Sequence, residues 1–165
     1  MTQSQKFNLT VKKVSDALEQ AGTPFRMVEF TESTRTAQEA ADRVGCELGQ
    51  IVKSLIFKGR QTGNPILVLT SGVNRVNEGL IGSYAGEQIE RADAQFVRQK
   101  TGYAIGGVPP IAHLQKMDTY MDEDLFCYQV IWAAGGTPYA IFEIKPGDLQ
   151  VISRAIIKGV KLESG

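Results

Sequence analysis

The stretch from Ile51 to Gly72, IVKSLIFKGRQTGNPILVLTSG, constrains the fold more than any other part of the chain. It contains two apolar runs separated by a loop with Gly and Asn. This pattern predicts a β-hairpin with strands near residues 51–58 and 65–70. The first run also carries a lysine, Lys53, in the middle of a strand that otherwise has the composition of a buried one.

Side chains alternate between the two faces of a strand, so Lys53 shares a face with Ile51, Leu55 and Phe57. Burying an unpaired ammonium group costs several kcal/mol. The residues alone leave two interpretations open. In the first, the strand begins only at Ser54 and the lysine stem extends to water. In the second, Lys53 points into a cavity that receives an anion or a carbonyl oxygen that gains charge.

Short helices and further strands surround this hairpin. Periodicity and capping residues predict helices within residues 9–22, 36–45, 74–86, 93–102 and 145–155, a strand within 25–30, a short strand within 87–92 and a second hairpin over 127–144. This order predicts an α+β fold around a curled, barrel-like sheet that is mixed or mostly antiparallel. The length predicts a single domain, residues 1–165.

Charge and hydropathy exclude some classes of function. The chain has 18 basic and 18 acidic residues, so no global field attracts nucleic acid and any RNA contact must be local. No apolar run approaches the roughly 20 residues of a membrane span, and the N-terminus lacks the apolar core of a signal peptide. We therefore expect a cytoplasmic protein that binds neither DNA nor membranes.

The residues that most often hold metals are sparse. Cys46 and Cys127 lie far apart and form no CxxC pair, which predicts free, buried thiols that act as apolar fillers rather than a disulfide, a zinc site or nucleophiles. His113 is the only histidine, and we expect it to anchor a loop by a hydrogen bond rather than to act as a base. We expect no metal and no cofactor.

The segment Thr101–His113, TGYAIGGVPPIAH, is dense in glycine and proline. Gly106 and Gly107 allow backbone N–H groups to approach a ligand, while Pro109 and Pro110 stiffen the chain that follows. The segment fits a small pocket or an oxyanion cradle built from main chain. An irregular turn between strands is an equal alternative. The spacing does not match a nucleotide phosphate loop.

Taken together, TAQEAADRVGCELGQIVKSLIF followed by TGYAIGGVPPIAH resembles the YbaK/prolyl-tRNA-synthetase-associated family, the free-standing and inserted aminoacyl-tRNA editing domains. The resemblance covers roughly residues 10–155. It implies a YbaK-like fold and hydrolysis of the ester between a wrong amino acid and the 3′ adenosine of a tRNA. The typical substrate is tRNA for proline carrying alanine or cysteine. It also implies a metal-free site. The expected partners are the CCA end of mischarged tRNA and prolyl-tRNA synthetase, and both a monomer and a homodimer stay open.

The resemblance assigns roles to individual residues. Lys53 takes the place of the lysine most closely tied to activity, and the GxxxP signature falls on Gly106 to Pro110. The predicted substrate-binding residues are Thr36, Ser71, Gly106, Gly107, Val108, Pro109, Pro110 and His113. Thr70, Ser71 and Asn74, at the end of the first hairpin, are candidates for the rim of the pocket, with simple capping as an at least equal alternative for all three. The attacking water would be positioned by loop main chain or by the terminal ribose hydroxyl.

Two departures from the family pattern bear on the substrate. Many relatives have GHP where this chain has Gly136, Thr137 and Pro138, and a Lys-Lys pair frequent in cysteine-specific members is replaced by the single Lys116. A small amino acid is therefore expected, without a choice between alanine and cysteine. The alternatives are a non-catalytic binding module for a tRNA 3′ end, a nucleotide or an amino acid, and a hydrolase of small acyl esters unrelated to tRNA.

Overall fold

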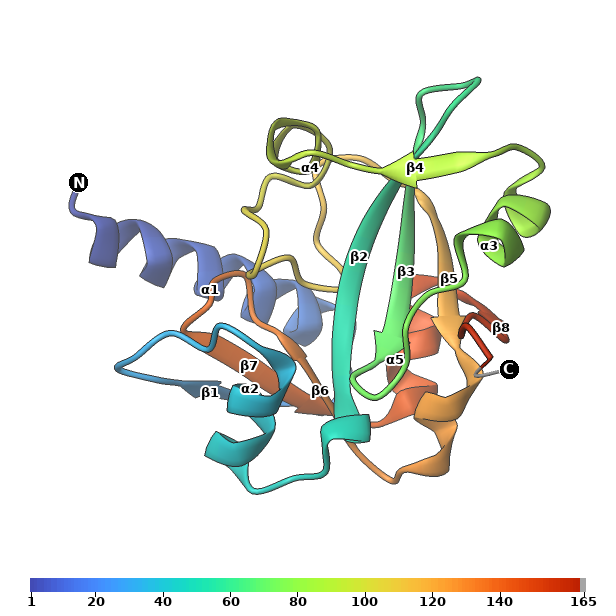
Figure 1. Cartoon of the computed structure of the whole chain (residues 1–165). Coiled ribbons are helices and arrows are strands. Elements are labelled where there is room, and N and C mark those ends of the chain that lie inside the picture. The colour runs from blue at the N-terminus through green and yellow to red at the C-terminus, as the bar shows by residue number, and fades with distance from the viewer. Residues whose placement is uncertain (164–165) are drawn as a thin grey trace.

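An eight-stranded mixed sheet organises the computed structural model, which describes residues 1–163 (Figure 1). The strands follow the order β1-β7-β6-β2-β3-β5-β8, and β4 pairs with β2 outside this path. Their bounds are β1 (Arg26–Glu29), β2 (Ile51–Gly59), β3 (Pro65–Ser71), β4 (Ile89–Arg91), β5 (Asp118–Asp122), β6 (Ile131–Ala134), β7 (Ala140–Ile144) and β8 (Ile156–Lys158). Within the described residues the path does not close into a barrel.

Five α-helices and two short 3-10 helices connect the strands. They are α1 (Gln3–Gln20), α2 (Ala37–Val44), α3 (Glu78–Ala85), α4 (Ala94–Thr101), α5 (Pro146–Ser153), η1 (Leu48–Gln50) and η2 (Glu123–Cys127). The pairs β3/β5, β5/β8 and β2/β6 are parallel, and the remaining pairs are antiparallel. The predicted α+β class and curled mixed sheet are confirmed.

Local signals set most element boundaries. Thr36 and Asp93 cap α2 and α4 by accepting a backbone N–H, and Gly45 and Gly102 end these helices with positive φ, as predicted. Helix α1 begins earlier than the predicted range 9–22, because Thr2 and Gln5 form a capping box ahead of it. Among residues 1–163, no helix has both the length and the apolar character that crossing a membrane requires.

Strands β5 and β8 were not predicted. Each is short, and the letters DTYMD and IIK carry no turn signal that would mark a hairpin. Both lie in parallel pairs, with β5 between β3 and β8. Parallel neighbours are distant in sequence, so such strands are specified by tertiary packing rather than by a local pattern.

The two faces of the sheet are covered differently. On one face, apolar side chains of β2, β3, β6 and β7 form the main core with α1, α4, α5 and the loop 103–111. The opposite face has two smaller clusters. One contains Ile51 and lies against α2, and the other contains Phe57 and lies against α3. Lys53 is on the same face of β2, between these two clusters.

Leu67 tests the main core. It is fully buried in the middle of β3, so Leu67→Ala should lower the free energy of unfolding by about 2–5 kcal/mol through lost burial and a residual void. The matched control is Leu9→Ala on α1, where the leucine is 55% exposed and the change should stay within about 0.5 kcal/mol. Urea unfolding followed by circular dichroism measures both, and equal losses would contradict the assignment of the core.

Candidate active site

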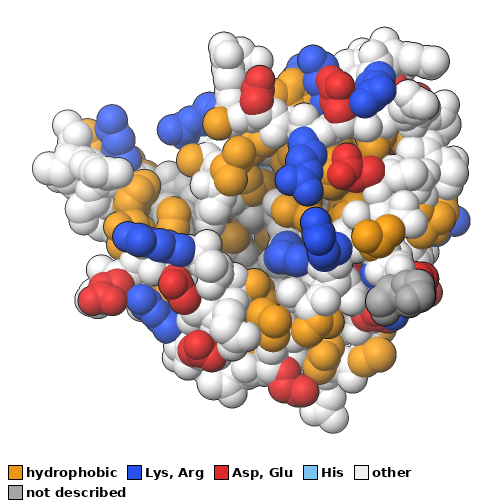
Figure 2. All heavy atoms as spheres, viewed as in Figure 1, with side chains coloured by type: hydrophobic (Ala, Val, Ile, Leu, Met, Phe, Trp, Pro, Cys, Tyr) orange, Lys and Arg blue, Asp and Glu red, His pale blue; other side chains and the backbone are white. Residues whose placement is uncertain are grey.

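A cavity of about 810 Å³ opens on the face of the sheet that carries α2 and α3. Strand β2 lines it from Ile51 to Phe57. The walls come from the start of α2, the segment 75–78, the end of β4, the segment 105–108, and β6 with the turn that follows it. Figure 2 shows Lys and Arg side chains grouped near the middle of this face, around a hollow in the surface.

The position of the cavity follows from an interruption in strand pairing. Strand β2 pairs with β3 along most of its length, but its other edge pairs with β6 only at Ile51 and Val52. That edge then pairs with β4 only from Phe57 onward. Among the described strands, residues 53–56 have no partner on this edge, and only the carbonyl oxygen of Ile56 accepts a hydrogen bond there, from the N–H of Ala92 just after β4. The cavity occupies the opening.

Lys53 lines this cavity, and strand β2 begins at Ile51 rather than at Ser54. The interpretation in which Lys53 precedes the strand is therefore wrong. Its Nζ donates a hydrogen bond of 2.6 Å to the backbone carbonyl oxygen of Asn74. None of the ion pairs within residues 1–163 includes Lys53. The ammonium group is thus oriented by a neutral acceptor and keeps its charge available.

Burial lowers the pKa of Lys53 below its ordinary value, and the positive charge of Arg75 acts in the same direction. The negative charge of Asp122 opposes this shift and favours the protonated form. Asp122 is 1% exposed, so its charge is little screened by water. The site therefore holds a partly desolvated cation that feels the charge of the buried Asp122 carboxylate without forming an ion pair with it.

The cavity is strongly basic for a chain with no net charge. Its titratable lining residues are Arg35, Lys53, Arg75, Glu78 and Arg91. The single acidic group among them, Glu78, lies 3.8 Å from the guanidinium of Arg91. The described lining residues include neither cysteine nor histidine. This arrangement suits an anionic ligand and offers no thiol or imidazole for nucleophilic or general-base chemistry.

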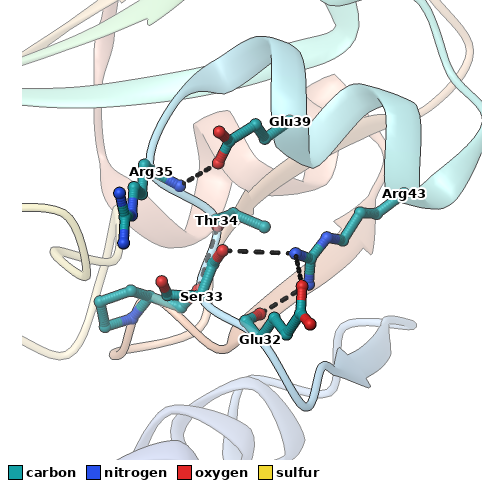
Figure 3. Close-up of polar contacts among 7 residues, drawn as sticks. Glu32, Ser33, Thr34, Arg35, Glu39 and Arg43 are labelled. Carbon is teal, nitrogen blue, oxygen red and sulfur yellow. Dashed lines mark hydrogen bonds and ion pairs between the residues drawn. The ribbon is translucent and has the colours of Figure 1, made fainter.

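One wall is the loop between β1 and α2, which polar contacts hold in a fixed shape (Figure 3). The guanidinium of Arg43 donates to the carbonyl oxygen of Glu32 at 2.6 Å and approaches its carboxylate at 3.4 Å. The backbone N–H and the hydroxyl of Thr34 both donate to the carbonyl oxygen of Pro138, at 2.8 and 3.0 Å. The loop is thereby attached to the turn between β6 and β7.

The same loop positions Arg35 and Thr36 at the cavity. The N–H of Arg35 donates to the carboxylate of Glu39 at 2.7 Å, and the hydroxyl of Thr36 accepts from the N–H of Glu39 at 3.1 Å (Figure 3). The predicted capping-box register of Thr36 and Glu39 is present in altered form, since the carboxylate binds Arg35. Thr36 lines the cavity, and its hydroxyl serves as the helix cap.

The GxxxP segment contributes two lining residues, Gly106 and Val108. Gly107, Pro109 and Pro110 are buried and lie outside the lining. The prediction of a free amide at Gly107 needs correction, because its N–H donates to the carbonyl oxygen of Ala104. A Cβ at Gly107 would lie 2.7 Å from Cα of Thr137, so glycine is required here for the two loops to touch.

Two other predicted residues are structural supports rather than lining residues. The hydroxyl of Ser71 donates to the carbonyl oxygen of Gly49 at 2.7 Å. His113 Nε2 lies 2.6 Å from the carbonyl oxygen of Pro109, so His113 anchors its loop as predicted, and burial lowers its pKa. Of the predicted set, the cavity therefore gathers Thr36, Lys53, Gly106 and Val108.

The expectation of buried thiols is wrong. Cys127 is exposed on η2, and Cys46 is only partly buried. The exposure of Cys127 was not foreseen because the sequence pattern did not predict η2. Arg35, Arg75 and Arg91 also line the cavity and were not predicted. The sequence offers one hint, the position of Arg75 just after the predicted hairpin.

Comparison with known proteins places this cavity in a family. The model of the aminoacyl-tRNA editing domain matches residues 31–152, which include Lys53 and the GxxxP segment. The chain belongs to the aminoacyl-tRNA editing domain family. Within this editing family, EbsC of Enterococcus faecalis, named "Putative Cys-tRNA(Pro)/Cys-tRNA(Cys) deacylase", is 27% identical over 131 residues, which are 78% of this chain and 80% of EbsC.

Two further editing-family relatives are informative. The proline–tRNA ligase of Staphylococcus aureus (strain Newman) is 30% identical over 151 residues, covering 86% of this chain and 26% of the ligase. The chain thus spans about a quarter of that enzyme. A solved structure described as "Crystal structure of a putative trans-editing enzyme for prolyl tRNA synthetase" has 44% sequence identity and a TM-score of 0.88, over 93% of this chain and 98% of that chain.

The buried charge of Lys53 should lower stability. Because its pKa is lower in the folded state, the unfolded chain binds more protons between the lowered pKa and the ordinary value of 10.5. The free energy of unfolding is therefore reduced at neutral pH and recovers as the pH rises through this window. Lys53→Met, which keeps the stem and removes the charge, should raise the midpoint of thermal unfolding at pH 7 and remove this recovery.

The control is Lys58→Met on the same strand. The ammonium of Lys58 lies 5.4 Å from the centroid of the Phe96 ring, so removing its charge should leave stability unchanged or slightly lower. A Lys53→Met protein that unfolds at a lower temperature than the unsubstituted chain would show that Lys53 is not under a desolvation penalty.

Proposed function

We propose that this chain is a trans-editing deacylase that hydrolyses the ester of a mischarged tRNA, with tRNA for proline carrying a small non-cognate amino acid such as alanine or cysteine as its substrate. The observation that carries the proposal is the partly buried, unneutralised ammonium of Lys53 in the cavity of an editing-domain family member. The names of EbsC and of the solved relative support the same reaction. We take residues 1–165 as one editing domain.

The charges of the cavity suit the 3′ end of a tRNA. Its phosphates are anionic and its last nucleotides are single-stranded, so a few local cations are sufficient for binding. Arg35, Arg75 and Arg91 lie on the walls around Lys53 and supply these charges. A chain with zero net charge can therefore bind the end of the tRNA without a wide basic surface.

Lys53 is the proposed catalytic residue. Hydrolysis of an ester passes through a tetrahedral intermediate whose oxygen becomes negative, and a preorganised cation stabilises that oxygen. An ammonium group has three N–H donors, and one of them is used by Asn74. The other two are available to the developing oxyanion or to a neighbouring phosphate. Holding the ammonium in place before the substrate arrives reduces the reorganisation that the reaction requires.

Activation of the water is proposed to come from loop main chain or from the terminal ribose hydroxyl. The described lining residues include one carboxylate, that of Glu78, and it pairs with Arg91. Ser54 lines the cavity, and its buried hydroxyl has no hydrogen-bond partner among the described residues. It is a candidate to hold the water or the substrate, because a buried hydroxyl without a partner is costly.

The size of the cavity is consistent with this substrate. A volume of about 810 Å³ exceeds what a small amino acid fills and leaves space for the terminal adenosine. A synthetase pocket discriminates small apolar side chains by only about 1–3 kcal/mol, so a second site is needed to remove errors. A prolyl-tRNA synthetase is accordingly the proposed partner, since it would supply the mischarged tRNA in the cytoplasm.

A binding module without catalysis is the second candidate. It is favoured by one observation, that the described lining offers no unpaired carboxylate and no imidazole to activate a water. Such a protein would bind the tRNA end, a nucleotide or an amino acid, and it would protect the ester from hydrolysis. Turnover therefore separates the two functions.

The test is hydrolysis of tRNA for proline charged with proline, alanine, cysteine, serine or 2-aminobutyrate. The unsubstituted chain should release at least one non-cognate amino acid and spare proline. Lys53→Ala should reduce that rate by about 100-fold or more, the scale of losing one oxyanion donor. Lys58→Ala, on the same strand but outside the cavity lining, should keep the rate within about twofold, since a single surface charge contributes little.

Three results would count against the proposal. Survival of every ester in the presence of the unsubstituted chain would favour the binding module. Equal rates for Lys53→Ala and the unsubstituted chain would remove Lys53 from catalysis. Full activity on a short acyl ester, unaffected by added tRNA, would point to a hydrolase with a different substrate.

A further inference from the structure

The carbonyl oxygen that holds Lys53 belongs to a segment with unusually many polar supports. Asn74 follows the end of β3, and its N–H donates to the carbonyl oxygen of Ser71 at 2.9 Å, forming a tight turn. Its side-chain amide nitrogen donates to Oδ2 of Asp122 and to Oδ2 of Asp124, both at 2.8 Å. Asn74 therefore connects Lys53 with two carboxylates at the end of β5 and the start of η2.

The two carboxylates are themselves fixed. Asp122 also accepts the N–H of Ser71 at 3.0 Å and the N–H of Asp124 at 2.9 Å. Asp124 is paired with the ammonium of Lys161 at 3.2 Å. Asn74 and Lys161 together lower the pKa of Asp124, so it remains an anion. Two carboxylates this close would repel one another without the shared amide donor between them.

The segment after β8 closes this arrangement from the other side. Val76 and Lys161 form an isolated antiparallel bridge, and the N–H of Leu162 donates to the carbonyl oxygen of Arg75 at 2.7 Å. Leu162 also lines the cavity. Lys161 and Leu162 lie beyond the residues 31–152 that match the family model. The backbone around Asn74 is thus bound on one side by Asp122 and Asp124 and on the other side by Lys161 and Leu162.

We propose that Asn74, Asp122, Asp124 and Lys161 form a clamp that positions the ammonium of Lys53, which makes Asn74 a positioning residue for the reaction. The role of the clamp in catalysis rests on the proposed function. Its role in positioning the Lys53 ammonium does not. The clamp fixes the main-chain carbonyl, and the carbonyl fixes Nζ. Lys161 completes the clamp by balancing the second carboxylate. The terminal segment outside the matched residues thereby becomes part of the site.

Two substitutions test the clamp through kinetics. Asn74→Ala removes the shared amide and should lower kcat by about 10–100-fold with KM nearly unchanged, the effect of misplacing a group by about 1 Å. Lys161→Met, at a partly exposed side chain, should lower kcat by a smaller factor, about 3–10-fold, because Asn74 remains. Lys161→Arg keeps the cation and should restore the rate. Lys116→Met, at an exposed lysine, is the control.

A second measurement needs no tRNA. In 15N-edited spectra of the full chain, the ammonium signal of Lys53, assigned by its loss in Lys53→Met, should be visible because the hydrogen bond slows exchange with water. It should broaden or vanish in Asn74→Ala, weaken in Lys161→Met and return in Lys161→Arg. Circular dichroism and thermal unfolding confirm that each variant is folded. Lys161→Met is the informative variant if Asn74→Ala does not fold.

The outcomes separate the two proposals. If the unsubstituted chain hydrolyses no ester, the proposed function fails, and the spectra alone decide on the clamp. Loss of the Lys53 signal in the folded variants, with recovery in Lys161→Arg, supports the clamp. An unchanged signal and an unchanged kcat in folded Asn74→Ala overturn it. A rate that falls equally in Lys161→Met and Lys161→Arg also overturns the role of the Lys161 charge.

Discussion

Incomplete pairing along one edge of β2 is the constraint on which the rest of the structure depends. This strand contacts three others, and β6 and β4 occupy only the two ends of the edge opposite β3. A backbone edge left open within a sheet must be satisfied by water or by a ligand. The opening places Lys53 in a cavity while the remaining residues of β2 pack in the core. One strand thus serves both the fold and the site.

The placement of charge follows from this arrangement. A cation on a strand between two apolar clusters is unfavourable, and the chain compensates with a main-chain acceptor and the charge of the buried Asp122 carboxylate rather than with an ion pair. Direct pairing of Lys53 with a carboxylate would stabilise the fold and weaken its attraction for an anion. This arrangement leaves the cation able to interact with a substrate, at the stability cost predicted above for Lys53.

Sequence patterns were sufficient where the signals are local. The hairpin of β2 and β3, the caps at Thr36 and Asp93, and the helix ends at Gly45 and Gly102 all depend on residues close in the chain. The alternation of side chains along β2 also identified Lys53. The resemblance to the editing family supplied the functional context that periodicity does not contain.

The remaining features depend on contacts between distant segments. Strands β5 and β8 pair in parallel across long connections, so no turn sequence between neighbouring strands predicts them. Asn74 was a candidate for the rim of the pocket, but its contacts with Asp122 and Asp124 cross about fifty residues and become visible only in three dimensions. The sequence predicted that the backbone N–H of Gly107 would face a ligand. The structure shows instead that its lack of a side chain permits the close contact with Thr137.

Helix α1 lies outside the matched residues 31–152 and packs against the turn between β6 and β7. A Cβ at Gly136 would lie 3.0 Å from Cγ2 of Thr10, and the ring of Phe7 packs 5.4 Å from that of Tyr139. Interiors this closely packed transmit small displacements. Replacements on α1 can therefore reshape the cavity wall at Thr137 without touching any lining residue, so homologues with identical pockets can still differ in the amino acid they accept.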